Sequence, residues 1–418
     1  MRIVGSNLAG DAGFDLLHPL LAEEIESNLV AAVKTDVVFE NDASPLEIFR
    51  GAIASSIGRI LQDEKSQLLI RLLRDGPSEY GTEIPPDLIG KRLTTKETTT
   101  ALSFISGKVV NSFQGAIAEL LALGPCLEIL GTLQRERAIP VKARLFVGDA
   151  VMARQLKSTV FAKCADMHIL EEPPDSQAPC LLKLHAVVEV KSYLPKQIEL
   201  EQQFAEHEKR ARNGLRVRGH VYDPGVMTIE PKGKPLRICV LPSQWKLPRK
   251  FWFADEDGRS MLNQPAIEPP TLGNTIERQS RRRCNITLRW SQEMIAASAY
   301  EMSLWFLGKL GEELYREGVP AEWAEMSPHE AGRNAATMQL YYAIRPYEQR
   351  LAHDQSLSRT ERLDMQRAIA LYNTYGFGYA LGMNYKDNKK RRRMLWVEDL
   401  RALAKGENTS DGCRIWPQ

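Results

Sequence analysis

The chain has 418 residues, a formal net charge of +2, 43% hydrophobic residues and 26% charged residues. These fractions are typical of a soluble globular protein and exclude wholesale disorder, and the length corresponds to two or three domains. The small net charge does not exclude a polyanionic partner, because the basic residues are clustered and clusters decide the local potential.

The six cysteines are widely scattered, without a Cys-x-x-Cys pair or histidines at zinc spacing, which favours free thiols in a reducing compartment. Residues 1–25 contain several acidic residues and lack the basic start and apolar core of a signal peptide. The most apolar long helix candidate, residues 294–310, is interrupted by Glu301 and Lys309 and is shorter than the roughly 20 apolar residues of a membrane span. We therefore expect a cytoplasmic protein that does not use a membrane.

Residues 1–100 are predicted to form a helical N-terminal region. The sequence Ser44-Pro45-Leu46-Glu47 is a capping box with proline at the first helical position. Apolar residues at helical spacing follow it as far as Gly76, a plausible helix stop. The pattern predicts one long helix between these two signals.

A second helix is predicted over residues 109–124, where Gly124 and Pro125 form the stop signal. Glu119 is the only charged residue between Lys108 and Glu128, so no basic residue one turn away can pair with it. A buried carboxylate without a partner costs several kcal/mol. Glu119 therefore either lies on a narrow solvated stripe or meets a partner elsewhere, such as a metal ion.

Residues 132–191 contain short apolar runs separated by turn segments and are predicted to form strands. The run from Leu184 to Tyr193 is typical of a central strand, yet it carries Glu189 and Lys191. Because side chains alternate along a strand, these two project from one face, with their α-carbons about 6.6 Å apart. Asp166 begins the preceding strand, so we expect Asp166 and Glu189 to meet across neighbouring strands.

A charged amphipathic helix is predicted over residues 197–212, and a further buried strand over residues 236–241. Strands followed by a helix and another strand indicate an α/β core. We assign this core to residues 101–255.

Residues 256–418 are predicted to be mostly helical, with a basic linker and one strand at residues 284–290. Capping boxes at residues 327–330 and 358–361 each predict the start of a helix. This region forms the third segment of the predicted domain organisation.

The acidic residues Glu119, Asp166 and Glu189, together with Lys191, resemble the motif of the PD-(D/E)xK nuclease superfamily. That pattern is a helix with an acid, a strand with Asp, a strand ending in Glu-x-Lys, then a helix and another strand. The resemblance covers residues 109–242. It implies a restriction-endonuclease-like mixed sheet and a Mg²⁺-dependent phosphodiesterase, with Mn²⁺ as a substitute ion.

In that resemblance Asp166, Glu189 and Glu119 hold the metal, since Mg²⁺ prefers oxygen ligands, and Lys191 acts on the attacking water. The chain departs from the family pattern in having Ala165 where the family has proline, and in lacking a Gln-x-x-x-Tyr after the motif. Asp149 is an alternative first ligand, although the spacing to Glu189 favours Asp166.

His168 and His185 also lie on predicted strands. A histidine on a strand is more typical of packing than of metal binding, so neither is assigned to the site.

Three basic clusters are candidates for holding a phosphate backbone without reading sequence. For each cluster a solvated face is the alternative. The clusters are Lys209, Arg210, Arg212, Arg216 and Arg218; Arg278, Arg281, Arg282 and Arg283; and residues 389–393. The first two lie closest in sequence to the candidate site and are preferred.

The sequence thus favours a metal-dependent nuclease that acts on DNA, in genome maintenance or in defence against foreign DNA. A catalytically silent relative that only binds nucleic acid, and a helical protein-interaction module, are the alternatives. A partner subunit or oligomer is compatible with each of them.

Overall fold

The computed structural model describes most of the first two thirds of the chain and parts of the remainder. The described residues are 8–17, 19–40, 43–75, 94–153, 162–172, 182–217, 220–222, 227–229, 234–243, 273–314, 347, 350–377, 393–394 and 414–415.

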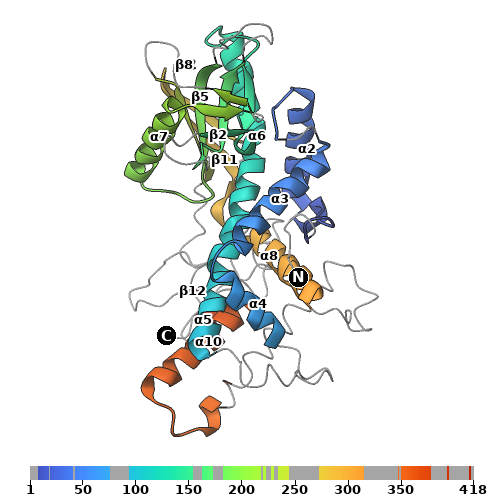
Figure 1. Ribbon diagram of the computed structural model, residues 1–418, viewed down its shortest axis with the longest axis vertical. Coiled ribbons are helices and arrows are strands. Elements are labelled where there is room, and N and C mark those ends of the chain that lie inside the picture. The colour runs from blue at the N-terminus through green and yellow to red at the C-terminus, as the bar shows by residue number, and fades with distance from the viewer. Residues whose placement is uncertain are drawn as a thin grey trace, which may run out of the picture.

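A seven-stranded mixed sheet forms the upper half of the molecule in Figure 1. Its strand order is β1-β4-β5-β9-β11-β10, and β8 pairs with β5. Strands β5, β9 and β11 are parallel, whereas β1, β4 and β10 pair antiparallel to their neighbours. The strands are β1 (Arg144–Val147), β4 (Met167–Glu171), β5 (Leu182–Val190), β8 (Met227–Ile229), β9 (Leu236–Ser243), β10 (Thr275–Ser280) and β11 (Arg283–Ser291). The predicted α/β class is confirmed.

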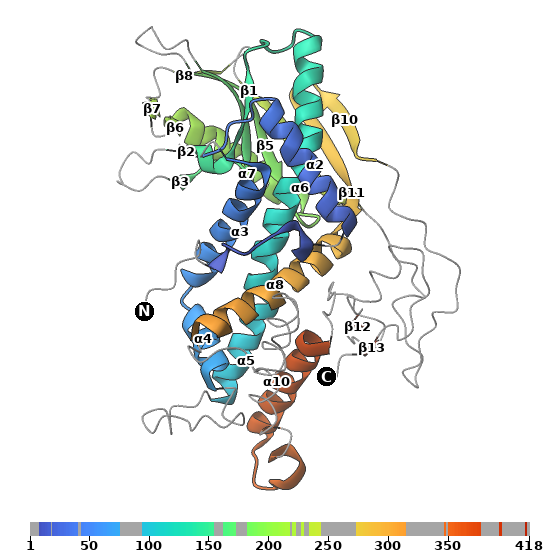
Figure 2. The same ribbon diagram turned by 90° about the vertical axis from the view of Figure 1, so that its right-hand side faces the viewer.

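Helices cover both faces of this sheet (Figures 1 and 2). Alternate residues of β5 enter two different hydrophobic clusters, as expected for a strand buried on both faces. Val188 packs in the cluster that contains helix α6 (Val110–Arg135). Val187 packs in the cluster that contains Phe204 of helix α7 (Gln197–Arg212). Over residues 186–190 the side chains of β5 therefore face α6 and α7 alternately, whereas Leu182 and Leu184 both lie in the cluster of α7.

The N-terminal helices belong to the same hydrophobic cluster as one face of the sheet. They are α2 (Pro19–Lys34), α3 (Pro45–Leu61), α4 (Ser66–Asp75) and α5 (Thr95–Phe104). Helices α2 and α3 pack against α6, whereas α4 packs against α5 and α8 (Gln292–Leu314). The capping box at Ser44 is formed, but the single long helix predicted after it is wrong. The chain turns at residues 62–65, where Asp63 accepts a hydrogen bond from the backbone of Lys65 and Ser66 donates to the carbonyl of Leu61.

The predicted end of a helix at Gly124 and Pro125 is also wrong, because α6 continues to Arg135. A proline inside a helix leaves the carbonyl four residues earlier without its donor. Here that carbonyl belongs to Leu121, and Asn28 of α2 donates to it from Nδ2 at 3.2 Å. Gly124 permits this contact, since a Cβ at this position would lie 2.3 Å from Oδ1 of Asn28. A neighbouring helix thus supplies the missing hydrogen bond.

The segment after residue 255 contributes to the same sheet. The strand predicted at residues 284–290 is β11, which pairs parallel to β9. The expected basic linker instead forms β10 and the turn of a β10–β11 hairpin. Strand β10 is exposed along most of its length, and its charged residues are typical of an edge strand, which explains why its sequence resembles a linker.

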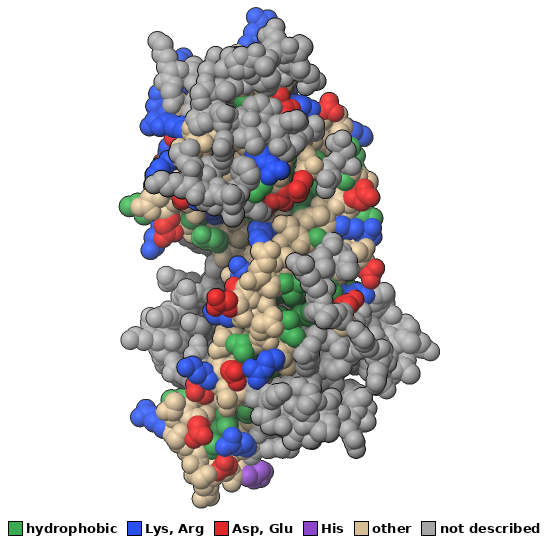
Figure 3. Space-filling view, in the orientation of Figure 1, with side chains coloured by type: hydrophobic (Ala, Val, Ile, Leu, Met, Phe, Trp, Pro, Cys, Tyr) green, Lys and Arg blue, Asp and Glu red, His purple; other side chains and the backbone are tan. Residues whose placement is uncertain are grey.

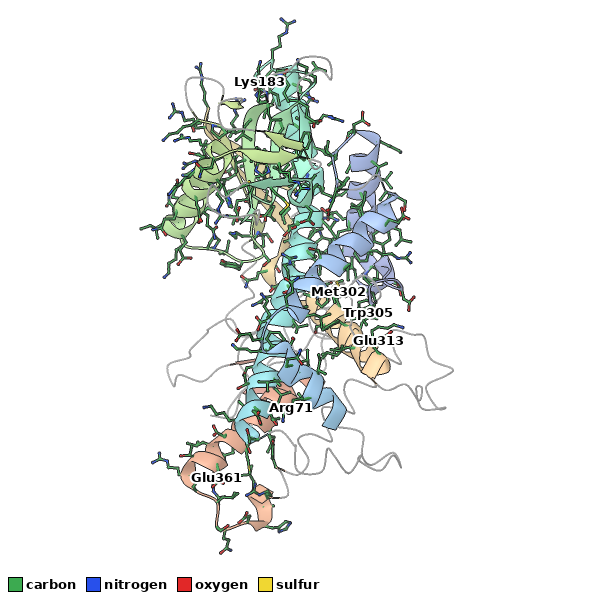
Figure 4. The ribbon with its side chains drawn as sticks, viewed as in Figure 1. Arg71, Lys183, Met302, Trp305, Glu313 and Glu361 are labelled. Atoms are coloured by element: carbon green, nitrogen blue, oxygen red, sulfur yellow. The ribbon has the colours of Figure 1, made fainter. Side chains whose placement is uncertain are left out.

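Two helices follow, α8 (Gln292–Leu314) and α10 (Arg359–Phe377). Met302 and Trp305 of α8 are buried near the centre of the molecule (Figure 4). The capping box between Ser358 and Glu361 is formed, whereas the helix predicted to begin at the capping box of residues 327–330 lies outside the described residues.

Four short strands form a second, antiparallel sheet of order β3-β2-β6-β7. They are β2 (Val151–Ala153), β3 (Ala162–Lys163), β6 (Leu215–Val217) and β7 (His220–Tyr222).

Helices α5 and α6 are joined by a π-helical segment, η2 (Ile105–Val109), into one helix of 41 residues. Among the described helices, it alone is long and apolar enough to cross a membrane by length and composition, but 67% of its most apolar window is buried inside the protein. A core helix of a soluble protein has the same features.

Candidate metal centre

Asp166 and Glu189 lie at the same end of the antiparallel strand pair β4–β5. The antiparallel pairing of Met167 with Val188 brings the residue before β4 beside the end of β5. The backbone N–H of Val190 donates to Oδ2 of Asp166 at 2.8 Å, which fixes the carboxylate next to Glu189. Lys183, at the start of β5, lies at the top of the view in Figure 4, so Glu189 occupies the opposite end of the strand.

The backbone around Asp166 is held closely. The N–H of Gly148 donates to the carbonyl of Asp166 at 2.6 Å, and a Cβ on Gly148 would lie 2.8 Å from that oxygen. Glycine is therefore required for the approach of this loop. Asp149, the alternative first ligand, follows Gly148 but is exposed, whereas Asp166 is held against the end of β5.

Glu189 is buried between two basic groups. The ammonium of Lys191 donates to Oε1 of Glu189, and Nε2 of His207 in α7 lies 2.8 Å from Oε2. The backbone N–H of Lys191 donates to the carbonyl of Val240 at 2.9 Å, which extends the pairing of β5 and β9 by one residue. Lys191 is thus fixed at both its backbone and its side chain.

The electrostatics of these groups show an excess of negative charge around Asp166. Burial raises the pKa of Asp166 well above its usual value, and repulsion by Glu189 and then Glu119 raises it further, against the hydrogen bond from Val190 and the charge of Lys191. Glu119 projects from α6, where it is half-buried, and it is close enough for this repulsion. The charges of Glu119, Glu189 and Lys191 therefore all act on Asp166.

The other two groups have pKa shifts in the directions expected of an ion pair. Burial raises the pKa of Glu189, but contact with His207 and the charge of Lys191 outweigh it, and the net pKa is lowered. For Lys191, burial lowers the pKa, but the attraction of Glu189 outweighs it and the net pKa is raised. Both groups are charged at neutral pH.

Two histidines that the sequence analysis did not assign to the site, His168 and His207, lie next to it. Burial and the nearby His207 lower the pKa of His168 to about 3, so its ring is neutral at physiological pH. His207 lies three residues after Phe204 and four before Ala211, both buried. This spacing places all three on one helix face, so helical periodicity contained a signal for His207.

His185 lies away from this site. Its Nε2 is 3.3 Å from Oε2 of Glu171, and Lys142 pairs with the same carboxylate at 2.6 Å. Those residues form a separate ion-pair cluster near the start of β5.

The described residues of the two preferred basic clusters lie on α7, on β6 and in the β10–β11 hairpin, whereas Arg218 and residues 389–392 of the third cluster lie outside the described residues. Lys209 is exposed on α7, and Arg210, one turn from His207, pairs with Glu206. Arg281 and Arg282 are exposed in the turn of the β10–β11 hairpin. Arg283, half-buried, pairs with Glu201 of α7. In Figure 3, Lys and Arg side chains along the left of the upper half, where α7 lies in Figure 1, alternate with acidic ones.

The carboxylates of Asp166 and Glu189 are the side chains here that could hold a divalent cation. Across the described parts of the chain, no three His, Cys, Asp or Glu side chains form a group that could hold an ion as they stand. Magnesium, however, is commonly held by only one or two protein carboxylates, with water and substrate phosphate completing its shell. Asp166 and Glu189 supply two such carboxylates, and the repulsion that raises the pKa of Asp166 is the kind that a cation relieves.

Comparison with known proteins gives no match to a family model, a curated protein or a solved structure.

Proposed function

We propose that this chain is a metal-dependent nuclease that hydrolyses phosphodiester bonds in DNA, on a restriction-endonuclease-like core. The observation that carries the proposal is the convergence of Asp166 and Glu189 with Lys191 at one end of the central strands, with Asp166 fixed by the N–H of Val190 at 2.8 Å. The order β4-β5-α7-β9, with β5 and β9 parallel, supports the proposed core.

In this proposal Asp166 and Glu189 hold the divalent cation, Mg²⁺ or Mn²⁺, and Glu119 adds negative charge from α6. The ion, when bound, would polarise a phosphate oxygen and favour deprotonation of an attacking water. The role of the acidic residues is to attract the cation and to fix its place against the sheet.

Hydrolysis forms a bond from the water oxygen to phosphorus and breaks the bond to the leaving oxygen, which takes up a proton. Lys191 carries a compact charge beside Glu189, with its side chain 12% exposed. A preorganised charge in such a site stabilises the negative charge that develops in the transition state. Lys191 also orients the attacking water through its N–H groups.

The basic residues of α7 and of the hairpin turn supply phosphate contacts outside this centre. Lys209 and Arg210 follow His207 on α7, and Arg281 and Arg282 project from the hairpin turn. Contacts of this kind position a duplex without reading its sequence. Genome maintenance or defence against foreign DNA is consistent with such a substrate.

The test is incubation of the purified protein with plasmid, linear and single-stranded DNA and with RNA, in Mg²⁺, in Mn²⁺ and with chelator. Glu189→Gln is the matched variant, because it keeps the shape of the side chain but removes its charge. We expect cleavage of DNA by the parent protein with either ion, and none with chelator or with the variant. Binding without cleavage in every condition would indicate the catalytically silent alternative. A protein that neither binds nor cleaves nucleic acid would refute the nuclease and the silent alternative alike.

A further inference from the structure

The pair formed by His207 and Glu189 has an unusual geometry. Nε2 of His207 and Oε2 of Glu189 lie 2.8 Å apart, yet they do not form an aligned hydrogen bond, and Nδ1 of His207 also has no hydrogen-bond partner among the described residues. The side chains are 11% and 6% exposed. Buried polar atoms are nearly always hydrogen-bonded, so unpaired ones need an explanation.

A metal ion shared by the two side chains would account for this geometry. Two neighbouring ligands of an octahedral ion, each about 2.1 Å from it, lie about 3.0 Å apart, close to the observed separation. Their lone pairs then point at the ion and not at each other. His168 lies close enough to affect both groups electrostatically, and its Nδ1 is likewise buried without a partner.

We propose that His207 is a nitrogen ligand of the metal ion at Glu189, and that it makes the site prefer a first-row transition-metal ion such as Mn²⁺ over Mg²⁺. The inference rests on the metal site of the proposed function. Imidazole nitrogen suits transition metals, whereas Mg²⁺ prefers oxygen. A site with one imidazole and carboxylates therefore differs in ion preference from one made of carboxylates alone.

The matched variants are His207→Gln and His185→Gln. Glutamine at position 207 offers an amide oxygen, which Mg²⁺ accepts, in place of the nitrogen. His185 is a buried histidine of β5 that pairs with Glu171 and lies outside the site, so its replacement controls for loss of a buried ring. Circular dichroism is the control that checks whether both variants are folded.

Metal affinity is measured on the full chain after chelation, by following the electron paramagnetic resonance signal of free Mn²⁺ with and without competing Mg²⁺. We expect His207→Gln to weaken Mn²⁺ binding by about tenfold or more, as for other changes at metal sites, and to change Mg²⁺ binding much less. His185→Gln should behave as the parent. An unchanged preference for Mn²⁺ in His207→Gln would overturn the assignment.

A second measurement uses the parent protein, so it does not depend on whether a variant folds. Pulsed electron paramagnetic resonance of Mn²⁺ bound to the parent protein should show coupling to a nitrogen nucleus, and its absence would also overturn the assignment. The DNA cleavage assay separates this inference from the proposed function. A metal site that depends on His207 in a protein that cleaves nothing refutes the nuclease alone, whereas cleavage with no nitrogen ligand refutes the inference alone.

Discussion

The hydrogen bonds from Asn28 to α6 give a quantitative test of how this long helix passes Pro125. Nδ2 of Asn28 lies 3.2 Å from the carbonyl oxygen of Leu121 and 3.4 Å from that of Leu120. The first carbonyl has no intrahelical donor, because residue 125 is proline. Asn28→Ala should therefore cost about 1–3 kcal/mol of the free energy of unfolding, the range for leaving a buried acceptor unsatisfied. Urea denaturation followed by circular dichroism measures this change.

The control is Ser27→Ala, an exposed neighbour on α2, which should change stability by less than about 0.5 kcal/mol. The mechanism itself is tested by a double-mutant cycle with Pro125→Ala, which restores the N–H that Leu121 lacks. In that background Asn28→Ala should cost about 1 kcal/mol less than in the parent. Equal costs in the two backgrounds would refute the idea that Asn28 substitutes for the missing donor.

Three further predictions concern the candidate site. Asp166→Asn removes a carboxyl whose pKa is raised in the folded state. Such a shift destabilises the folded protein increasingly as pH rises from about 3.9, the usual pKa in the unfolded state, toward the raised pKa of the folded state. The variant should thus be more stable than the parent at pH 7, by on the order of 1 kcal/mol, and this gain should disappear near pH 4. A difference in melting temperature between variant and parent that stays constant from pH 4 to 8 would contradict this. Lys191→Ala should keep DNA affinity but lower the single-turnover cleavage rate by on the order of a hundredfold, and Lys191→Arg should not restore it; a parental rate would remove Lys191 from the chemistry. Replacing Arg281 and Arg282 with Gln should weaken binding and reduce the slope of log affinity against log salt by about two, with the cleavage rate at saturation unchanged; an unaltered slope would exclude both from the DNA interface.

Local signals in the sequence were sufficient where short-range physics decides the structure. The capping boxes at Ser44 and Ser358 begin helices because their hydrogen bonds join residues three positions apart. The helix at residues 197–212 and the strand beginning at Leu236 follow from apolar periodicity in the same way. The alternation of side chains on β5 also placed Glu189 and Lys191 on one face.

The sequence was insufficient where a distant residue supplies the decisive contact. Pro125 stops a helix by local rules, but Asn28, 93 residues before Leu121, satisfies the carbonyl that the proline leaves open. Strand β10 has the exposed, charged sequence of a linker, and only pairing with β11 makes it part of the sheet. These outcomes depend on neighbours that no window of sequence contains.

The candidate site divides in the same way. The sequence determined which carboxylates lie at the end of the strands, because the alternation of side chains and the pairing of neighbouring strands can be predicted from short segments of sequence. Only the tertiary structure brought α7 over the sheet and set His207 against Glu189 at 2.8 Å, since the position of a helix on a sheet depends on packing between Phe204 and the strands beneath it. Packing of whole elements, summed over many weak contacts, therefore decided which side chain completes the site.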